Sequence, residues 1–316
     1  MSASNVAGSK WTAAQIPTQA GRTALITGAN SGIGYRAALE LARHGAHVLL
    51  GCRNYEKGHA ALDRLLREVP GAAAELVELD MASLASIRAF AAAFAARGIA
   101  LDLLINNAGV MALPKRELTA DGFERQFGTN HLGHFALTGL LMPQLLAASA
   151  PRVVTVASLA HRNGKIDFDN LQSERNYKPW DAYGESKLAN ILFANELNRR
   201  AVAAHSKLVS IPVHPGVSAT NIIANGPGSS GPKAMVLKLL APLIMQPDAA
   251  GALPTLYAAA SPQARGGEYI GPDGLMEMKG SPVVVKPRPK ALDQAVGQRL
   301  WTVSEELTGV VYPSLS

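Results

Sequence analysis

Short apolar runs alternate with longer amphipathic stretches between residue 22 and about residue 270 of the chain. The short runs have the apolar character of buried strands, which we expect at residues 23–27, 47–50, 74–79, 101–106, 152–157, 207–213 and 268–270. The longer stretches repeat apolar residues at helical spacing, which predicts helices at residues 33–43, 57–68, 84–96, 122–146, 183–203 and 249–260. Strands that alternate with helices form a parallel sheet between two helical layers. The pattern therefore predicts an α/β fold with one doubly wound, Rossmann-type parallel sheet and helices on both faces.

The strand expected at residues 207–213 contains Pro212, which has no N–H group to donate to a neighbouring strand. We therefore expect Pro212 at the end of this strand or at a bulge. Beyond residue 271 the chain is rich in proline and then regains helical spacing over residues 292–307. This tail predicts an extended arm followed by a terminal helix.

The chain has no internal repeat and no Gly/Ser linker that would separate a second domain. We expect an N-terminal extension (residues 1–20) and one domain (residues 21–316) that includes a C-terminal arm (residues 272–316). Residues 216–247 combine glycines and prolines with an apolar run, and we expect them to form a mobile lid over a substrate. A permanently docked surface helix is the alternative interpretation, since apolar helical faces are usually buried.

The 316 residues are 48% hydrophobic and 17% charged, a balance that can fill a core and that argues against a disordered, collagenous or coiled-coil protein. Cys52 is the single cysteine, which excludes an intramolecular disulfide and leaves too few thiols for a structural zinc site. The net charge of +6 comes from scattered lysines and arginines, without a basic run. We therefore expect no nucleic-acid binding, since such recognition usually needs these residues clustered on one face.

Residues 1–20 contain Lys10 and lack the apolar run of a signal peptide or membrane anchor. The most apolar later stretch, residues 234–245, is interrupted by Lys238 and Pro242. It is also shorter than the ~20 residues that span a bilayer. We expect a cytoplasmic protein without a membrane span.

A glycine-rich segment follows the first expected strand and opens the first expected helix. Glycines there allow a tight turn and the close approach of a pyrophosphate, whose charge is met by the N–H groups at the start of the helix. Because the segment lies within a βαβ unit, it favours a dinucleotide site over a plain glycine turn. The segment consists of Thr27, Gly28, Ala29, Asn30, Ser31, Gly32, Ile33 and Gly34.

The end of the second expected strand indicates which dinucleotide would bind. Sheets that bind NAD place a carboxylate there, about 20 residues past the glycines, to bond the ribose 2′-hydroxyl. This chain instead has Arg53 and Asn54, and a guanidinium suits the 2′-phosphate of NADP. We expect NADP(H) in preference to NAD(H), with a solvated surface arginine as the alternative interpretation of Arg53.

Small and polar residues close the third and fourth expected strands. The carboxyl ends of parallel strands meet at the edge where such sheets bind ligands, so we expect these residues to flank the adenine and its ribose. Asp80 could instead cap the helix that starts near Ser83. The residues concerned are Asp80, Met81, Asn106, Asn107, Ala108 and Gly109.

Tyr183 and Lys187 lie four residues apart at the start of an expected helix, which puts both side chains on one helical face. A phenol with an ordinary pKa near 10 is a poor proton shuttle at neutral pH, whereas a nearby ammonium favours the phenolate and lowers that pKa. The pair could therefore form a tuned acid/base. On its own such a pair is more often a surface feature, so the surrounding motifs decide.

Together, these motifs resemble the short-chain dehydrogenase/reductase family over residues 21–310. Asn130 matches the family's asparagine in the fourth crossover helix, and Ser158 matches its serine after the fifth strand. Tyr183 and Lys187 match its Tyr-x-x-x-Lys pair. Four separated motifs occur in the family's order, which makes the resemblance specific.

The resemblance implies an oxidoreductase that transfers a hydride between NADP(H) and a carbonyl or alcohol substrate. Tyr183 would be the general acid in reduction and the general base in oxidation, and Ser158 would hydrogen-bond the substrate oxygen. Lys187 would hold the nicotinamide ribose and lower the Tyr183 pKa, while Asn130 would anchor a water in a proton relay. The family's segment that positions the nicotinamide carboxamide corresponds to Pro215, Gly216, Val217 and Thr220.

Residues 51–54, 129–135, 166–171 and 187–190 are similar to the branch that contains retinol dehydrogenases, WW-domain oxidoreductases and protochlorophyllide reductases. That branch generally uses NADP(H). We expect the chain to differ from that branch in having no N-terminal anchor and no WW domain, and it has Ala157 where a second serine is common. An apolar substrate wall could be formed by Phe168, Tyr177 and Trp180.

A non-catalytic, NADP-sensing regulatory protein on the same fold is the alternative function. Such a protein could lose its acid/base residues, whereas all four catalytic positions are retained here, so catalysis is favoured. We expect a small-molecule carbonyl or alcohol as partner, and a homo-oligomer is compatible with the sequence. Four histidines match no metal-ligand spacing, so we expect no metal and assign them structural or exposed positions. They are His131, His134, His161 and His214.

Overall fold

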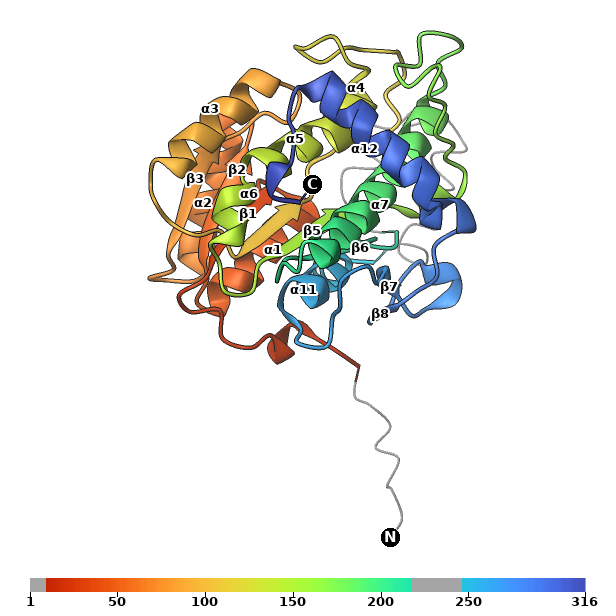
Figure 1. The fold of residues 1–316 in the computed structure, drawn as a ribbon. Coiled ribbons are helices and arrows are strands. Elements are labelled where there is room, and N and C mark those ends of the chain that lie inside the picture. The colour runs from red at the N-terminus through yellow and green to blue at the C-terminus, as the bar shows by residue number, and fades with distance from the viewer. Residues whose placement is uncertain (1–9, 218–245, 316) are drawn as a thin grey trace.

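The computed structural model describes residues 10–217 and 246–315, and within them the strands form one sheet in the order β3-β2-β1-β4-β5-β6-β7-β8 (Figure 1). Neighbouring strands are parallel, except that β7 and β8 are antiparallel. The predicted doubly wound sheet is confirmed, and the predicted extended arm adds an antiparallel edge strand to it. The strands are β1 (Thr23–Thr27), β2 (His47–Cys52), β3 (Ala74–Glu78), β4 (Leu103–Asn106), β5 (Arg152–Val156), β6 (Val209–Val213), β7 (Ile270–Pro272) and β8 (Pro282–Val284).

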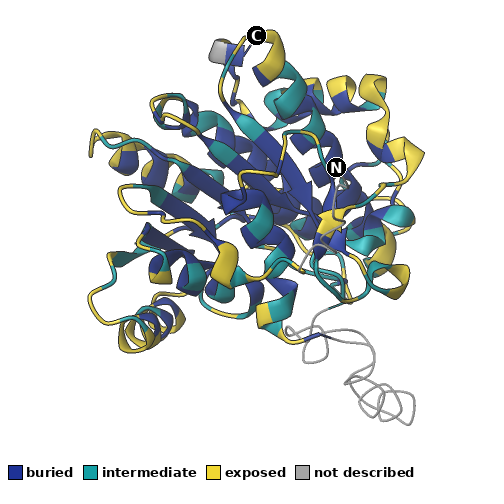
Figure 2. Ribbon diagram, turned by 90° about the horizontal axis from the view of Figure 1, so that it is seen from below, coloured by how far each residue is buried: buried dark blue, intermediate teal, exposed yellow. Residues whose placement is uncertain are grey.

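Alternate strand residues pack into two separate cores, one on each face of the sheet. Ala24 and Ile26 of β1 pack into the first core, while Leu25 packs into the second. Figure 2 shows the strands as the most buried layer of the molecule. The first face is covered by α1 (Gly32–Arg43), α2 (Tyr55–Glu68), α10 (Asp248–Gly251) and α11 (Leu253–Ala260), and the second by α3 (Leu84–Ala95), α5 (Gly133–Leu140), α6 (Met142–Leu146), α7 (Pro179–Ala203) and α12 (Gln294–Thr308).

The single helix predicted over residues 122–146 is wrong, because the chain is broken there into four short helical pieces. After α4 (Arg125–Phe127), residues 128–132 form a π-helical turn, followed by α5 and α6. A Cβ on Gly133 would collide with the carbonyl oxygen of Met81, so α5 packs directly on the backbone that follows β3. Pro143 lies in the first turn of α6 and cannot donate the N–H that would continue α5.

The expectation that Pro212 lies at a strand end or a bulge is also wrong, since it pairs with Thr155 inside β6. Backbone groups alternate between the two edges of a strand. The Val213 carbonyl accepts from Ala157 on the β5 side, so the backbone nitrogen of Pro212 faces the β7 side. There β6 pairs through Val213 and Ile270 alone, so no ladder donor is needed at Pro212.

The C-terminal arm returns to the second face of the sheet and completes an aromatic cluster. The ring of Phe135 in α5 lies 5.1 Å from that of Trp301 in α12 and 5.0 Å from that of Tyr312. The Tyr312 hydroxyl donates to the Phe135 carbonyl oxygen at 2.5 Å. The terminal helix predicted at residues 292–307 is confirmed as α12.

The predicted lid over residues 216–247, including the apolar run at residues 234–245, lies almost entirely outside the described residues. Within the two described segments, no helix has the length and apolar character needed to cross a bilayer.

Candidate functional site

The glycine turn between β1 and α1 leaves no room for side chains. Gly28 has a φ of 67° and Gly32 a φ of 58°, in the left-handed region that favours glycine. A Cβ on Gly28 would lie 3.0 Å from the Ala108 Cα atom, and one on Gly34 would lie 2.6 Å from the Gly28 carbonyl oxygen. The turn is therefore closed by direct backbone contact between α1, β1 and the loop after β4.

The start of α1 fits a phosphate group. Ser31 is the N-cap residue, and its side chain makes no capping hydrogen bond to the helix. The first N–H groups of α1 thus lack a side-chain cap, in the arrangement that favours an anion at a helix N-terminus. With the side-chain-free turn at Gly28 and Gly32, these residues fit the pyrophosphate of a dinucleotide.

The loop after β4 is held to the glycine turn by Thr27 and Asn107. The Thr27 hydroxyl accepts from the backbone N–H groups of Asn107 and Ala108, both at 2.9 Å. The Asn107 side chain donates to the Thr27 carbonyl oxygen at 2.8 Å. Two loops predicted to flank the same ligand are therefore joined directly.

Arg53 follows β2 at the same edge of the sheet and is exposed. Its guanidinium makes no hydrogen bond or ion pair with the residues that the structure describes. Asn54 caps α2, since its side-chain oxygen accepts from the Lys57 backbone N–H at 2.8 Å. Arg53 is thus available to an external anion, while Asn54 already has a structural role.

The alternative that Asp80 caps a helix is wrong, because Ser83 is the residue that caps α3. Asp80 instead closes its own turn, with one carboxylate oxygen accepting from the Ala82 N–H at 2.9 Å. Met81 is buried and lies under Gly133 of α5. Of this pair, the partly exposed Asp80 is the one open to a ligand.

Ser158 and Tyr183 come together from β5 and α7. Ser158 follows β5, and its hydroxyl accepts from the Ala160 N–H at 3.2 Å. Burial raises the pKa of Tyr183, and the neighbouring Ser158 side chain offsets this only in part. The expected lowering of this pKa by Lys187 is therefore not found. The Lys187 ammonium lies 5.8 Å from the centroid of the Tyr183 ring and donates instead to the Val156 carbonyl oxygen.

Lys187 is a buried ammonium without a carboxylate partner among the described residues. Its Nζ atom donates to the Val156 carbonyl oxygen at 2.9 Å, and burial lowers the pKa of Lys187 to about 8. A Cβ on Gly109 would lie 3.6 Å from this Nζ atom and 3.0 Å from the Asn130 side-chain oxygen. The absence of a side chain at Gly109 therefore lets its backbone approach both predicted catalytic residues closely.

We expect Lys187→Met to stabilise the ligand-free protein at pH 7, because it removes a buried charge that the folded state disfavours. The free energy of unfolding should rise by on the order of 3 kcal/mol, and Tm by several degrees. The Val156 carbonyl oxygen keeps a donor in the variant, since the Asn190 side chain also bonds it.

The stabilisation expected from Lys187→Met depends on pH, because it comes from removing the protonated lysine. The lysine pKa is lower in the folded state, so the cost is complete below pH 8 and disappears as pH rises from about 8 to 10.5. Melting curves of wild type and Lys187→Met across that window should converge. A Tm difference that stays constant with pH would contradict the assignment.

Asn130 lies in the π-helical turn and holds two elements together. Its side-chain oxygen accepts from the Val110 N–H, while its side-chain nitrogen donates to the Val110 carbonyl oxygen and to the Ser186 hydroxyl, all at 2.9 Å. Ser186 in turn donates to the Tyr183 carbonyl oxygen at 2.8 Å. Sequence reasoning missed Ser186, although its position three residues after Tyr183 was a usable signal.

The four histidines are buried and hydrogen-bonded, as their structural assignment predicts. His134 Nδ1 lies 2.9 Å from the Asn130 carbonyl oxygen, and its Nε2 lies 2.9 Å from the Thr27 hydroxyl. Since a carbonyl can only accept, Nδ1 carries the proton and Nε2 accepts from Thr27. Burial lowers the pKa of His134 to about 4, which keeps it neutral. It therefore links the glycine turn to the Asn130 turn.

The predicted nicotinamide segment leaves β6 in a sharp turn. Gly216 has a φ of 68°, and the Val217 N–H donates to the Met278 carbonyl oxygen at 2.8 Å. The Pro215 carbonyl oxygen accepts from the Gln246 side chain at 2.6 Å. Thr220 lies outside the described residues.

The predicted apolar wall is only partly assembled. The Trp180 ring is 53% exposed and packs edge-on against the Tyr183 ring, with centroids 6.0 Å apart. Tyr177 directs its hydroxyl to the Leu113 carbonyl oxygen at 2.8 Å. Phe168 lies under the Arg299 guanidinium of α12, at 4.1 Å from its ring centroid. The expected apolar wall of Phe168, Tyr177 and Trp180 stays a prediction.

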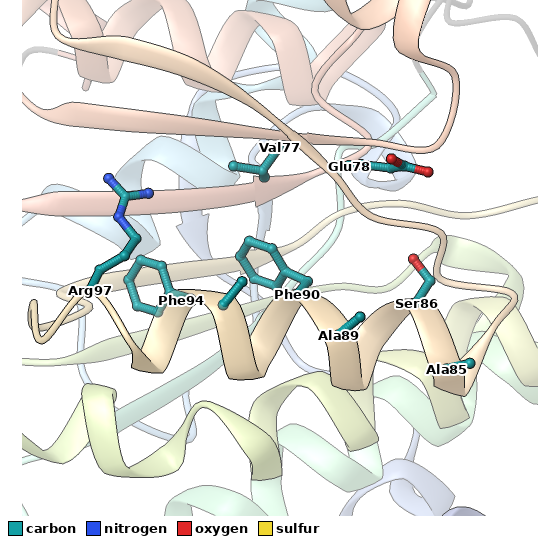
Figure 3. A pocket seen from close by; sticks show the side chains of 9 residues that line it. Val77, Glu78, Ala85, Ser86, Ala89, Phe90, Phe94 and Arg97 are labelled. Atoms are coloured by element: carbon teal, nitrogen blue, oxygen red, sulfur yellow. The ribbon is translucent and has the colours of Figure 1, made fainter.

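A groove of about 580 Å³ lies elsewhere, between β3 and α3 (Figure 3). Its walls include Phe90 and Phe94 of α3 and Val77 of β3, with Glu78 and Arg97 at the margins. None of the predicted site residues lines it, so it is separate from the candidate site. The described residues also contain no cluster of His, Cys, Asp and Glu that could hold a metal ion.

The sequence matches the short chain dehydrogenase family over residues 22–226. It is 41% identical over 300 residues to human retinol dehydrogenase 13, covering 93% of this chain and 87% of that protein.

Among solved structures, an uncharacterized protein from Mycobacterium Paratuberculosis is similar at 42% identity and a TM-score of 0.79, covering 96% of this chain and all of that one. A dehydrogenase structure from Beutenbergia cavernae with bound NADP is 25% identical at a TM-score of 0.58, covering 77% of this chain and 91% of that one. With its family match, its Rossmann-type sheet and a turn that fits a dinucleotide, this chain belongs to the short-chain dehydrogenase/reductase family of NAD(P)-binding oxidoreductases.

Proposed function

We propose that the protein is an NADP(H)-dependent oxidoreductase that interconverts an apolar alcohol and its aldehyde or ketone. The observation that carries the proposal is the buried Tyr183 phenol, whose pKa responds to the neighbouring Ser158 side chain, beside the buried Lys187 ammonium. These groups lie at the edge of the sheet where the glycine turn opens, which is where a dinucleotide would reach them.

The raised pKa of Tyr183 supports catalysis in the reductive direction. Burial keeps the phenol protonated at neutral pH, so Tyr183 can donate a proton to the carbonyl oxygen as that oxygen gains negative charge. Ser158 hydrogen-bonds the same oxygen and orients it towards the phenol. When bound, NADPH supplies the hydride.

Lys187 and Asn130 have supporting roles in this proposal. The Lys187 ammonium is buried without a carboxylate partner among the described residues, and in this proposal it donates to the ribose hydroxyls of the cofactor. Both polar atoms of the Asn130 side chain bond to Val110 and Ser186, so this amide holds α7 in place. Burial of these groups excludes water from the proton-transfer step.

The preference for an apolar substrate rests on two observations. Retinol, the substrate in the name of the human relative, is an apolar alcohol. Trp180 also presents an exposed aromatic face next to the Tyr183 ring. NADPH fluorescence on binding, followed by loss of NADPH absorbance with retinaldehyde and a panel of shorter aldehydes and ketones, tests the function. Binding of NADPH without turnover of any carbonyl would favour the NADP-sensing alternative.

The preference for NADP(H) predicts the effect of Arg53→Asp. A carboxylate repels the 2′-phosphate and can accept from a ribose 2′-hydroxyl. The ratio of kcat/KM for NADPH to that for NADH should fall by at least about 10-fold, because bonds between charged groups contribute about 1.5–3 kcal/mol each.

The matched control is Arg67→Asp, which makes the same charge change at an exposed site near the other end of α2. It should leave the cofactor ratio unchanged. If Arg53→Asp and Arg67→Asp gave the same ratio as wild type, Arg53 would be a solvated surface residue.

A further inference from the structure

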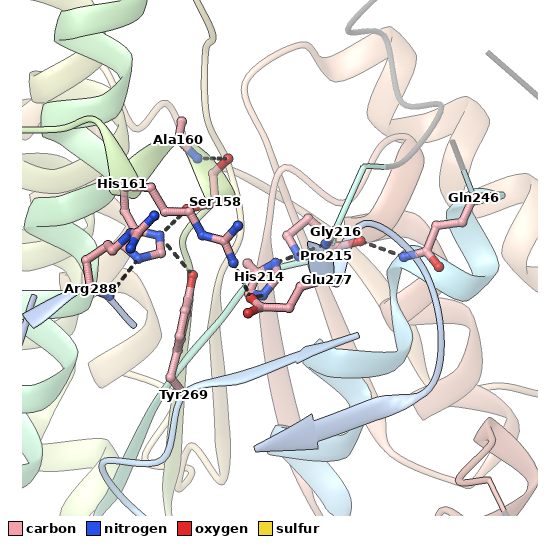
Figure 4. Close-up of polar contacts among 11 residues, drawn as sticks. Ser158, Ala160, His161, His214, Pro215, Gly216, Gln246, Tyr269, Glu277 and Arg288 are labelled. Carbon is pink, nitrogen blue, oxygen red and sulfur yellow. Dashed lines mark hydrogen bonds and ion pairs between the residues drawn. The ribbon is translucent and has the colours of Figure 1, made fainter. Parts of the chain in front are cut away.

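Three charged or titratable side chains from distant parts of the chain are joined through the carboxylate of Glu277, which Figure 4 shows against His214. Glu277 lies in the turn after β7, His214 directly follows β6, and Arg162 ends the short helix η3 (Leu159–Arg162) that Ser158 caps. One oxygen of Glu277, Oε2, lies 3.0 Å from His214 Nε2 and 2.8 Å from the Arg162 guanidinium. A single carboxylate oxygen therefore joins the segment after β6 to the segment that carries Ser158.

His214 is fully buried, and its hydrogen bonds fix its tautomer. The Gly216 backbone N–H lies 3.2 Å from His214 Nδ1. Since an N–H group can only donate, Nδ1 accepts this bond and the proton of the neutral ring sits on Nε2, from which it is donated to Glu277. Burial lowers the pKa of His214, consistent with the neutral form. Glu277 thus determines the orientation of the imidazole that holds Gly216.

The turn that carries Glu277 has an unfavourable backbone conformation. Met276 has a φ of 53° and Glu277 a φ of 60°, so two consecutive residues with side chains adopt the left-handed region. Such a conformation persists where surrounding contacts hold it, and it concentrates at functional sites. The Met276 side chain is 66% exposed and contributes little to holding the turn, whereas the Glu277 carboxylate bonds two partners.

The backbone of the same turn clamps the segment after β6 from a second side. The Val217 N–H donates to the Met278 carbonyl oxygen at 2.8 Å. A Cβ on Gly216 would collide with that carbonyl oxygen, so the two backbones are in direct contact. The position of residues 215–217 is therefore set by Glu277 through His214 and by the neighbouring Met278 through the backbone.

We propose that Glu277 is a positioning residue that sets the nicotinamide-binding segment at Gly216 and Val217 relative to Ser158, acting through His214 and Arg162. This inference rests on the proposed function, because residues 215–217 matter for hydride transfer only if they hold the nicotinamide. Glu277 itself touches neither the substrate oxygen nor Tyr183 in the proposed mechanism. Its effect is on alignment, which is where small displacements have large effects on rate.

The variant Glu277→Gly removes the carboxylate at a position where glycine tolerates the positive φ, so it tests the carboxylate itself. Glycine adopts a positive φ readily, which offsets part of the loss of the two carboxylate bonds, so this variant should stay folded with a Tm within a few degrees of wild type. We expect its single-turnover rate of NADPH oxidation by retinaldehyde to fall about 10- to 100-fold. The fluorescence enhancement of bound NADPH, which reports on the nicotinamide and needs no substrate, should also be reduced. Affinity for 2′,5′-ADP, which lacks nicotinamide, should be unchanged.

Two further variants make the test specific. Met276→Gly relieves the same backbone conformation without removing a carboxylate, and should behave as wild type in rate and fluorescence. Glu277→Gln keeps an oxygen that can accept from His214, and should recover part of the rate lost in Glu277→Gly. A stable Glu277→Gly variant with wild-type rate and fluorescence would overturn the inference, as would an equal loss in Met276→Gly.

Failure of the proposed function has a different signature. Wild-type protein that binds NADPH but oxidises it with no carbonyl contradicts the catalytic proposal, while the fluorescence comparison still decides the role of Glu277. Wild-type protein that binds no NADPH overturns both.

Discussion

Tyr183→Phe should lower kcat about 10²- to 10⁴-fold while NADPH binding stays close to wild type. The substitution removes the proton donor that the proposed mechanism uses and no group near the glycine turn or Arg53. It also removes a buried hydroxyl next to Ser158, but leaves the ring packed on Trp180. Steady-state kinetics with retinaldehyde and a fluorescence titration with NADPH measure the two quantities separately.

Tyr257→Phe is the matched control, since it removes a phenol hydroxyl from α11 on the opposite face of the sheet. We expect wild-type kcat from it. A Tyr183→Phe variant that turned over at the wild-type rate would remove Tyr183 from the mechanism.

Gly34→Ala should weaken NADPH binding by about 10-fold or more and lower the free energy of unfolding by about 1–3 kcal/mol. The new Cβ would lie 2.6 Å from the Gly28 carbonyl oxygen and 2.5 Å from the Asn107 side-chain nitrogen, so the turn and the loop after β4 must both shift. Those shifts move the backbone that a pyrophosphate approaches. Fluorescence titration and thermal melting measure the two effects.

Helix propensity alone predicts the opposite outcome, because alanine is favoured over glycine by about 1 kcal/mol within a helix. Gly297→Ala in α12 isolates this contribution, since its Cβ would have only ordinary contacts, the closest at 3.8 Å. Gly297→Ala should match or exceed wild-type stability and bind NADPH normally. If Gly34→Ala matched Gly297→Ala in stability and NADPH affinity, the turn at Gly34 could accommodate a Cβ atom without shifting.

The sheet and most helices were predictable because local patterns carry that information. Each of β1 to β6 contains short apolar runs, and their alternation with amphipathic helices predicts a parallel sheet. The break at residues 128–132 was not predictable in this way, since the apolar spacing continues through the π-helical turn. The turn ends at Gly133, which contacts the backbone at Met81, a residue distant in sequence.

In the candidate site, too, local motifs were predictable from the sequence and tertiary contacts were not. Ser158, Tyr183 and Lys187 were identified from motif and resemblance, but the raised pKa of Tyr183 depends on how deeply tertiary packing buries the phenol. The ammonium expected to lower that pKa donates to the Val156 carbonyl oxygen instead, a contact that no spacing rule contains. The contact of Glu277 with His214 was not predicted, since the two residues lie 63 positions apart and Glu277 belongs to no motif.

The aromatic cluster around Phe135 also bears on how the protein is made. Tyr312 follows Phe135 by 177 residues, so at typical rates of synthesis roughly 10 to 35 s separate their emergence from the ribosome. During that interval the ring of Phe135 lacks the two aromatic partners, Trp301 and Tyr312, that cover it in the finished protein. Nascent chains in which the early strands have already paired still present this apolar surface, which is a target for chaperones and a starting point for aggregation. Translation that stalls before Trp301 prolongs that exposure.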